Sequence, residues 1–171
     1  MFSNSTRILI FIVALTYSVY ELVTGTGMGY VAIAAALWLA AGYIRYGPIR
    51  PAFIALYQGK FDRARRLAES IKFPSLLSQQ SQAYFHWIHG VLAFSDGDYL
   101  NADIRMRQAI AGNLRTSNDK CIAIATLAQI VAKNGQLDEA NQILDDAILI
   151  PHKDETGAFL SSTRNEIRNT P

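Results

Sequence analysis

Two histidines on one expected helix are the residues of this sequence best suited to metal chemistry. His86 and His89 lie three positions apart and would share one face of a helix. Such a pair can bind zinc together with a carboxylate, but no Asp or Glu lies within a helical turn of either histidine, and His152 is distant. A metal enzyme built on this pair is therefore the least supported of the functions we consider. We expect no metal ion and no cofactor.

Other catalytic constellations are missing from the sequence. It contains no glycine-rich phosphate loop, no G-x-S-x-G nucleophile elbow and no H-E-x-x-H metal motif. Cys121 is the only cysteine, which excludes an intrachain disulfide and a zinc site built from cysteines. A lone buried thiol is more often structural than reactive. We therefore expect a protein that is not an enzyme and has no catalytic residues.

The composition excludes two broad classes of protein. Of the 171 residues, 50% are hydrophobic and only 18% are charged, with a mean hydropathy of +0.11. These values exclude an intrinsically disordered chain, which needs low hydrophobicity and high net charge. The net charge is only +2, and no stacking aromatics are interleaved with Arg63, Arg65 and Arg66. We therefore expect no nucleic-acid partner.

The apolar residues are concentrated in the first 46 positions. Two runs, 8–23 and 30–44, contain a single charge, Glu21, and are separated by the glycine-rich stretch TGTGMG. The runs have 16 and 15 residues, against the roughly 20 that a helix needs to cross a bilayer. Neutral flanking residues, with Arg7 and Arg45 reaching towards the headgroups, could extend them. We predict a transmembrane helical hairpin over 7–46, with helices at 8–23 and 29–45, after a tail at 1–6.

The positive charges around the runs predict an orientation. The loop between the runs carries no Lys or Arg, whereas Arg7, Arg45 and Arg50 flank the other side. The positive-inside rule then places both termini in the cytoplasm, and we expect a two-span protein of a bacterial inner membrane. The alternatives for these runs are a cleaved signal peptide and a helical hairpin buried in a soluble domain.

Beyond residue 47 the sequence repeats with a period of 38. The three motifs are Gly59-Lys-Phe61-Asp-Arg-Ala64, Gly97-Asp-Tyr99-Leu-Asn-Ala102 and Gly135-Gln-Leu137-Asp-Glu-Ala140. The glycine can end one helix in the left-handed conformation without a steric penalty. The large apolar residue then anchors the next helix, and the alanine lets the two helices cross closely. The pattern predicts three helical hairpins that stack into one continuous core.

This pattern resembles the tetratricopeptide repeat family. The resemblance rests on the three motifs, on the small residues Gly90 and Ala128 upstream of two of them, and on Pro151. It covers about 49–151, in units at 49–74, 75–112 and 113–151 of a repeat region at 48–154. The family repeat has about 34 residues, so these units are longer, and unrelated helical-hairpin repeats are the alternative. The resemblance implies an all-α fold with a curved stack of paired helices.

The periodicity and the breaker residues together predict where the helices lie. We expect helices over 51–58, 61–72, 76–95, 98–111, 118–133, 137–149 and 156–168. The last of these belongs to a capping helix and tail at 155–171, with Phe159, Leu160 and Ile167 as its apolar points.

The resemblance also implies a binding groove, because the first helix of each unit lines the inner face of such a stack. The side chains expected there are aromatic with a polar end: Phe53, Tyr57, Tyr84, Trp87, Phe94, Gln129 and Lys133. Aromatic side chains commonly anchor peptides and amphipathic helices, and Trp87 is the strongest candidate. The alternative is that these aromatics only pack the core.

Charge is unevenly spread over the repeat region. Residues 45–72 contain seven basic and two acidic side chains, whereas residues 135–155 contain six acidic side chains and one Lys. The basic block would adjoin the predicted membrane hairpin. We therefore expect its arginines to lie at anionic lipid headgroups: Arg45, Arg50, Arg63, Arg65 and Arg66.

Together these patterns predict a membrane-anchored protein–protein interaction module, an adaptor or assembly factor. Its partner would be a protein or peptide bound in a cytoplasmic groove. The alternative function is a structural subunit of a membrane complex that acts mainly through its transmembrane hairpin.

Overall fold

The computed structural model describes residues 46–169 and, before them, residues 12, 13, 16, 17, 19, 20, 23, 30, 33–35, 37, 38 and 42. The chain divides into two compact units, Met1–Gly47 and Pro48–Pro171. All the described residues before Gly47 are helical. Residues 46–169 form helices joined by short loops and contain no strand, which confirms the all-α prediction for this part of the chain.

The predicted transmembrane hairpin is corrected by the structure. Among the described residues, no helix has both the length and the apolar character needed to cross a bilayer. The uninterrupted apolar runs contain only 16 and 15 residues, and a bilayer core requires roughly 20. The predicted two-span membrane localisation and the predicted orientation depended on this hairpin, so they are not supported either. Most of the predicted helices 8–23 and 29–45 lie outside the described residues.

The helices after Gly47 agree closely with those predicted. The structure places them at α3 (Ile49–Tyr57), α4 (Phe61–Glu69), α5 (Gln79–Ser95), α6 (Tyr99–Ala111), α7 (Ser117–Lys133), α8 (Leu137–Ile148) and α9 (Asp154–Arg168), with a 3-10 turn η1 (Pro74–Leu76) before α5. The largest differences are the end of α4, predicted at residue 72, and the start of α5, predicted at residue 76. Pro74 begins the separate turn, and the Ser78 side chain then caps α5 by accepting a hydrogen bond from the Ser81 backbone N–H.

The glycines of the three motifs adopt the predicted left-handed conformation. Gly59, Gly97 and Gly135 have φ angles of 71°, 79° and 84°. Helices α4, α6 and α8 begin two residues after these glycines, at the large apolar residue of each motif. The motif alanines Ala64, Ala102 and Ala140 are fully buried. Each motif is therefore the joint of one helical hairpin.

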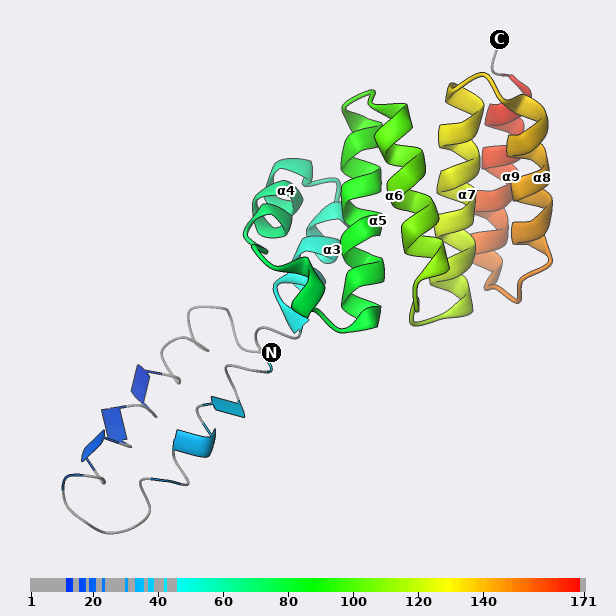
Figure 1. The fold of residues 1–171 in the computed structure, drawn as a ribbon. Helices are drawn as coiled ribbons and strands as arrows, with labels where there is room; N and C mark the ends of the chain where they lie inside the picture. Colours follow the sequence, from blue (N-terminus) through cyan, green and yellow to red (C-terminus); the bar gives the residue numbers. More distant parts are fainter. Residues whose placement is uncertain are drawn as a thin grey trace. The chain divides into compact units, whose positions relative to one another are not determined.

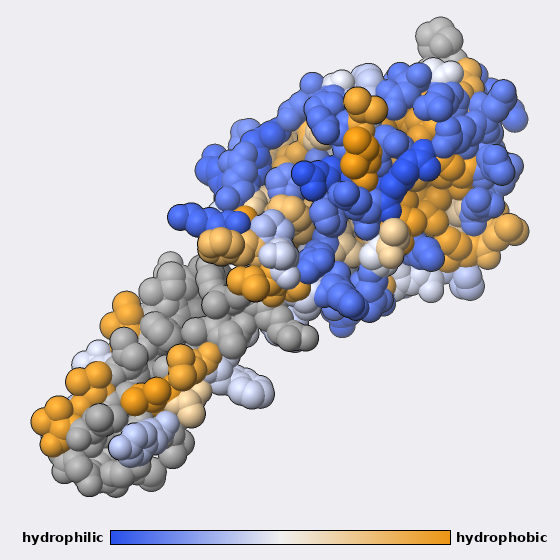
Figure 2. All heavy atoms as spheres, in the orientation of Figure 1, coloured by the Kyte–Doolittle hydropathy of each residue, from blue (hydrophilic) through white to orange (hydrophobic). Residues whose placement is uncertain are grey.

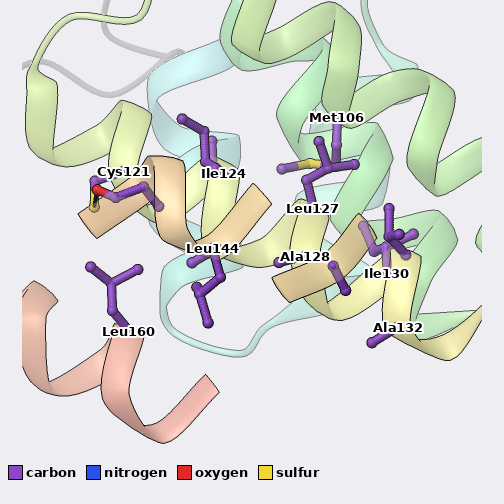
Figure 3. Close-up of a cluster of buried hydrophobic side chains, with 14 of the residues drawn as sticks. Met106, Cys121, Ile124, Leu127, Ala128, Ile130, Ala132, Leu144 and Leu160 are labelled. Atoms are coloured by element: carbon purple, nitrogen blue, oxygen red, sulfur yellow. Dashed lines mark hydrogen bonds between the residues drawn. The ribbon is translucent and has the colours of Figure 1, made fainter. Parts of the chain in front are cut away.

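The hairpins α3–α4, α5–α6 and α7–α8 lie side by side along residues 48–169, and α9 packs on α7 and α8 (Figure 1). We call α3, α5 and α7 the first helices, and α4, α6 and α8 the second helices. Side chains from successive elements meet in one core, in which Met106, Ile130, Leu144 and Leu160 come from α6, α7, α8 and α9 (Figure 3). This arrangement has the stacked-hairpin form that the period predicts.

The last helix has the predicted two-sided character. Leu160 and Ile167 are buried and Phe159 is half-buried against the core, whereas Ser161 and Ser162 are exposed. Helix α9 therefore covers the apolar end of the α7–α8 hairpin and leaves a polar outer surface.

The left-handed glycines give a first prediction. Replacing Gly97 with Ala should lower the free energy of unfolding by about 1–2 kcal/mol, because a Cβ is strained at this φ. Gly97→Asn should cost less, since Asn tolerates the left-handed region. Urea unfolding followed by circular dichroism measures both variants. Equal stability of the Ala variant and the original protein would contradict the role assigned to Gly97.

Candidate interaction face

The first helices share one face of the stack, which we call the groove face. Helix α3 contacts α5, α5 contacts α7, and α7 contacts α9. The hairpins also meet where a second helix packs on the next first helix, α4 on α5 and α6 on α7. All seven residues predicted for the groove belong to α3, α5 or α7. Tertiary contacts then divide them into three groups.

Three of the aromatics form one cluster where α3 meets α5. The Phe53 ring meets the rings of Tyr84 and Trp87 edge-on, with centroids 5.0 and 4.9 Å away. Tyr84 and Trp87 stack with centroids 5.9 Å apart. The Trp87 side chain is only 4% exposed, whereas Phe53 and Tyr84 are half-buried. Trp87 therefore packs in the core, and Phe53 and Tyr84 remain partly exposed beside it.

Two other predicted aromatics differ sharply in exposure. Tyr57, one turn after Phe53 on α3, is 79% exposed. Phe94 is half-buried and packs on Tyr99, with ring centroids 5.8 Å apart. Of the predicted aromatics, Tyr57 is thus the one with most of its surface accessible to a partner.

A hydrogen bond across two hairpins holds Tyr84 in place. The Tyr84 hydroxyl donates to Asp119 Oδ2 at 2.5 Å and accepts from the Arg115 backbone N–H at 3.3 Å. Burial and this bond to Asp119 together raise the pKa of Tyr84 to about 12. No local pattern in the sequence connects Asp119 with Tyr84, because the two residues lie 35 positions apart.

The polar end of the groove face lies on α7. Gln129 Nε2 donates to Glu166 Oε2 of α9 at 3.0 Å, so this side chain is already engaged within the chain. Lys133, one turn further on, is exposed. The two polar residues predicted for the groove therefore have different roles, since Gln129 joins α7 to α9 and Lys133 projects a positive charge.

The histidine pair lies away from the groove face, between α5 and α6. His86 Nδ1 lies 3.3 Å from an Arg105 guanidinium nitrogen, and His89 packs on the Phe85 ring. Burial and the charge of Arg105 lower the pKa of both imidazoles. In the part of the chain that the structure describes, no three His, Cys, Asp or Glu side chains are grouped to hold a metal ion.

The remaining candidate residues occupy separate surfaces. Arg50, Arg63 and Arg66 are exposed, Arg65 forms a salt bridge of 2.8 Å with Asp96, and Arg45 lies outside the described residues. The headgroup contacts predicted for these arginines depended on the transmembrane hairpin and are withdrawn with it. Cys121 is buried, and burial raises the pKa of its thiol, which favours a structural role.

An open depression of about 670 Å³ lies between the start of α5 and the end of α6. Its lining is mainly neutral amides and small residues, including Gln82, Gln108 and Asn113, with His86 beside them. This lining offers hydrogen bonds but no nucleophile and no pair of carboxylates.

Comparisons of the chain with protein-family models, with curated proteins and with solved structures found no significant match.

The different burial of Trp87 and Tyr57 gives a second prediction. Trp87→Ala should lower the free energy of unfolding by about 3–5 kcal/mol, because it opens a cavity beneath Phe53 and Tyr84. Tyr57→Ala should change it by less than about 0.5 kcal/mol, as is usual for exposed positions. Denaturant titration of both variants checks this. A stable Trp87→Ala protein would contradict the core position of Trp87.

The raised pKa of Tyr84 gives a third prediction. The folded state holds the Tyr84 phenol proton more tightly than the unfolded state does. The protonated phenol therefore contributes fully to the free energy of unfolding below pH 10, and this contribution is lost as the pH rises towards 12. Stability should therefore fall more steeply between pH 10 and 12 in the original protein than in Tyr84→Phe. Urea unfolding at several pH values measures the slopes, and parallel slopes would exclude the effect.

Proposed function

We propose that residues 48–169 are a protein-interaction module of the tetratricopeptide-like kind, which binds an extended or helical segment of a partner protein on the groove face. The tandem hairpins, repeated at a period of 38, support this proposal because such stacks create extended concave surfaces. The histidine pair and Cys121 lie away from this face and take no part in it.

One observation carries the proposal. The groove face combines the exposed side chain of Tyr57, the partly exposed rings of Phe53 and Tyr84, and the exposed side chain of Lys133. Tyr and other aromatic side chains provide large contact areas at low cost in conformational entropy. Lys133 adds a charge that favours a partner segment with a carboxylate near one end.

Hydrogen bonds within the chain also fix two side chains of the groove face. Tyr84 is fixed by Asp119 of α7, and Gln129 is fixed by Glu166. A surface that is already ordered loses less conformational entropy on binding. These links support recognition by a preformed face.

The test is selection of peptides from a random displayed library on the full chain. A selected peptide should bind at least ten-fold more weakly to the variant Tyr57→Ala/Lys133→Glu, because its aromatic and charged contacts are lost. Fluorescence anisotropy with the labelled peptide measures the affinity.

The matched control for this test is Phe73→Ala. Phe73 is also a highly exposed aromatic, but it lies between α4 and η1, outside the groove face. This variant should bind the peptide as the original protein does. Equal loss of binding in both variants, or selection of no peptide, would count against the groove face.

A further inference from the structure

The imidazole of His89 on α5 is turned into the stack and lacks a hydrogen-bond partner. Its Nε2 atom is buried and forms no hydrogen bond within the part of the chain that the structure describes. The ring lies against Phe85, with ring centroids 4.3 Å apart. A buried nitrogen without a partner is tolerable on a neutral imidazole, but it is far more costly on a charged one.

The charged groups that act on His89 come from three helices and are mostly positive. Arg105 faces it from α6, Arg65 faces it from α4, and His86 lies one turn before it on α5. Glu69 of α4, which is exposed, opposes them and favours the charged imidazole. Burial and then the charge of Arg105 lower the pKa of His89 below its ordinary value of 6.5. His89 is therefore neutral in the closed stack at neutral pH.

Of the two second helices beside His89, α4 is held less closely to α5 than α6 is. Helix α5 contacts α6 far more extensively than it contacts α4. An added Cβ at Gly90 would lie 2.8 Å from Met106 Sδ, so the α5–α6 contact leaves no spare room. On α4 only the small side chains of Ala64 and Ala68 are fully buried. Figure 2 shows a mainly hydrophilic surface over α4.

The α3–α4 hairpin also has a hydrophobic cluster of its own. Ile49 of α3 and Ala68 of α4 pack there with Phe85 of α5, whereas the larger cluster of buried residues extends from α5 to α9. The ion pair between Arg65 and Asp96, which links α4 to the end of α5, is largely exposed and so adds little. The α3–α4 hairpin can therefore open as a unit while the larger cluster stays closed.

We propose that His89 makes the attachment of the α3–α4 hairpin sensitive to pH, and that protonation of its imidazole releases the hairpin from α5. In the closed joint a proton on Nε2 has no acceptor, and separation of α4 from α5 brings it to water. His86 does not need this opening, because it lines the open depression between α5 and α6. Release would carry Phe53 and Tyr57 of α3 away from the rest of the groove face. The device needs no partner and does not depend on the proposed function.

The direction of the pH effect follows from proton linkage. In the released form the His89 imidazole is hydrated, and its pKa returns towards 6.5, above its value in the closed joint. Protons therefore favour the released form, and the closed form loses stability as the pH falls through 6.5. Above this range the imidazole is neutral in both forms, so pH has no effect through His89.

Hydrogen exchange of the full chain, followed by mass spectrometry at pH 7.5 and pH 5.5, tests the proposal. Labelling times are corrected for the pH dependence of intrinsic exchange. We expect amide protection in α3 and α4 to fall at least three-fold at pH 5.5, while protection in α7 and α8 changes less than two-fold. Equal loss in all these helices, or no loss in α3 and α4, would overturn the proposal.

The variant His89→Leu tests whether this residue is the sensor. Leu keeps an apolar contact with Phe85 and cannot take up a proton, so the acid-induced loss in α3 and α4 should fall below two-fold. The matched control is His152→Gln, because His152 lies between α8 and α9, away from the α4–α5 joint. This control should lose protection as the original protein does. A full loss in His89→Leu would assign the acid response to another group.

A second variant keeps the test decisive if His89→Leu does not fold. Arg105→Gln keeps both imidazoles and removes a positive charge that opposes their protonation. The acid-induced loss in α3 and α4 should then be at least halved, and circular dichroism at pH 7.5 checks that the variant is folded. An unchanged loss in folded Arg105→Gln would contradict the proposed sensor.

Discussion

Each helical hairpin in residues 48–169 has an apolar face that it cannot bury alone, and this constraint organises the rest of the structure. The glycine at each joint lets the chain reverse within three residues, and the buried alanine that follows lets the two helices approach closely. Gly90 serves the same need on α5, where an added Cβ would lie 2.8 Å from Met106 Sδ. Hairpins whose helices lie this close together stack on their neighbours. Their buried side chains form two clusters, and the partly buried rings of Phe53 and Tyr84 pack against both.

Stacking gives the two sides of the molecule different environments. On the groove side the first helices approach one another, so an aromatic between two hairpins, such as Trp87, becomes buried. Tyr57 lies near the end of α3 and keeps most of its surface exposed. On the opposite side each second helix keeps an exposed strip, which includes Arg66, Ile104 and Gln142.

Polar links between hairpins add specificity to this packing. The Arg107 guanidinium bridges Asp103 of α6 and Glu139 of α8, and Asn118 accepts a hydrogen bond from Thr156 of α9. Ion pairs this exposed contribute only about 0–1 kcal/mol each. The Arg107–Glu139 and Thr156–Asn118 links join residues 32 and 38 positions apart. They therefore also fix the position of one helical element relative to the next.

The sequence alone determined the local structure, namely the period of 38, the left-handed glycines, and the starts of α4 and α8 at Phe61 and Leu137. These features depend on residues within one or two helical turns. It could not determine that Trp87 is buried while Tyr57 is exposed, or that Tyr84 is held by Asp119. The apolar composition of the first 46 residues also led to a wrong prediction, a membrane hairpin that the described residues do not support. Burial and long-range hydrogen bonds are decided only when segments distant in the chain pack together. Helical periodicity reflects local contacts and gives no information about that packing.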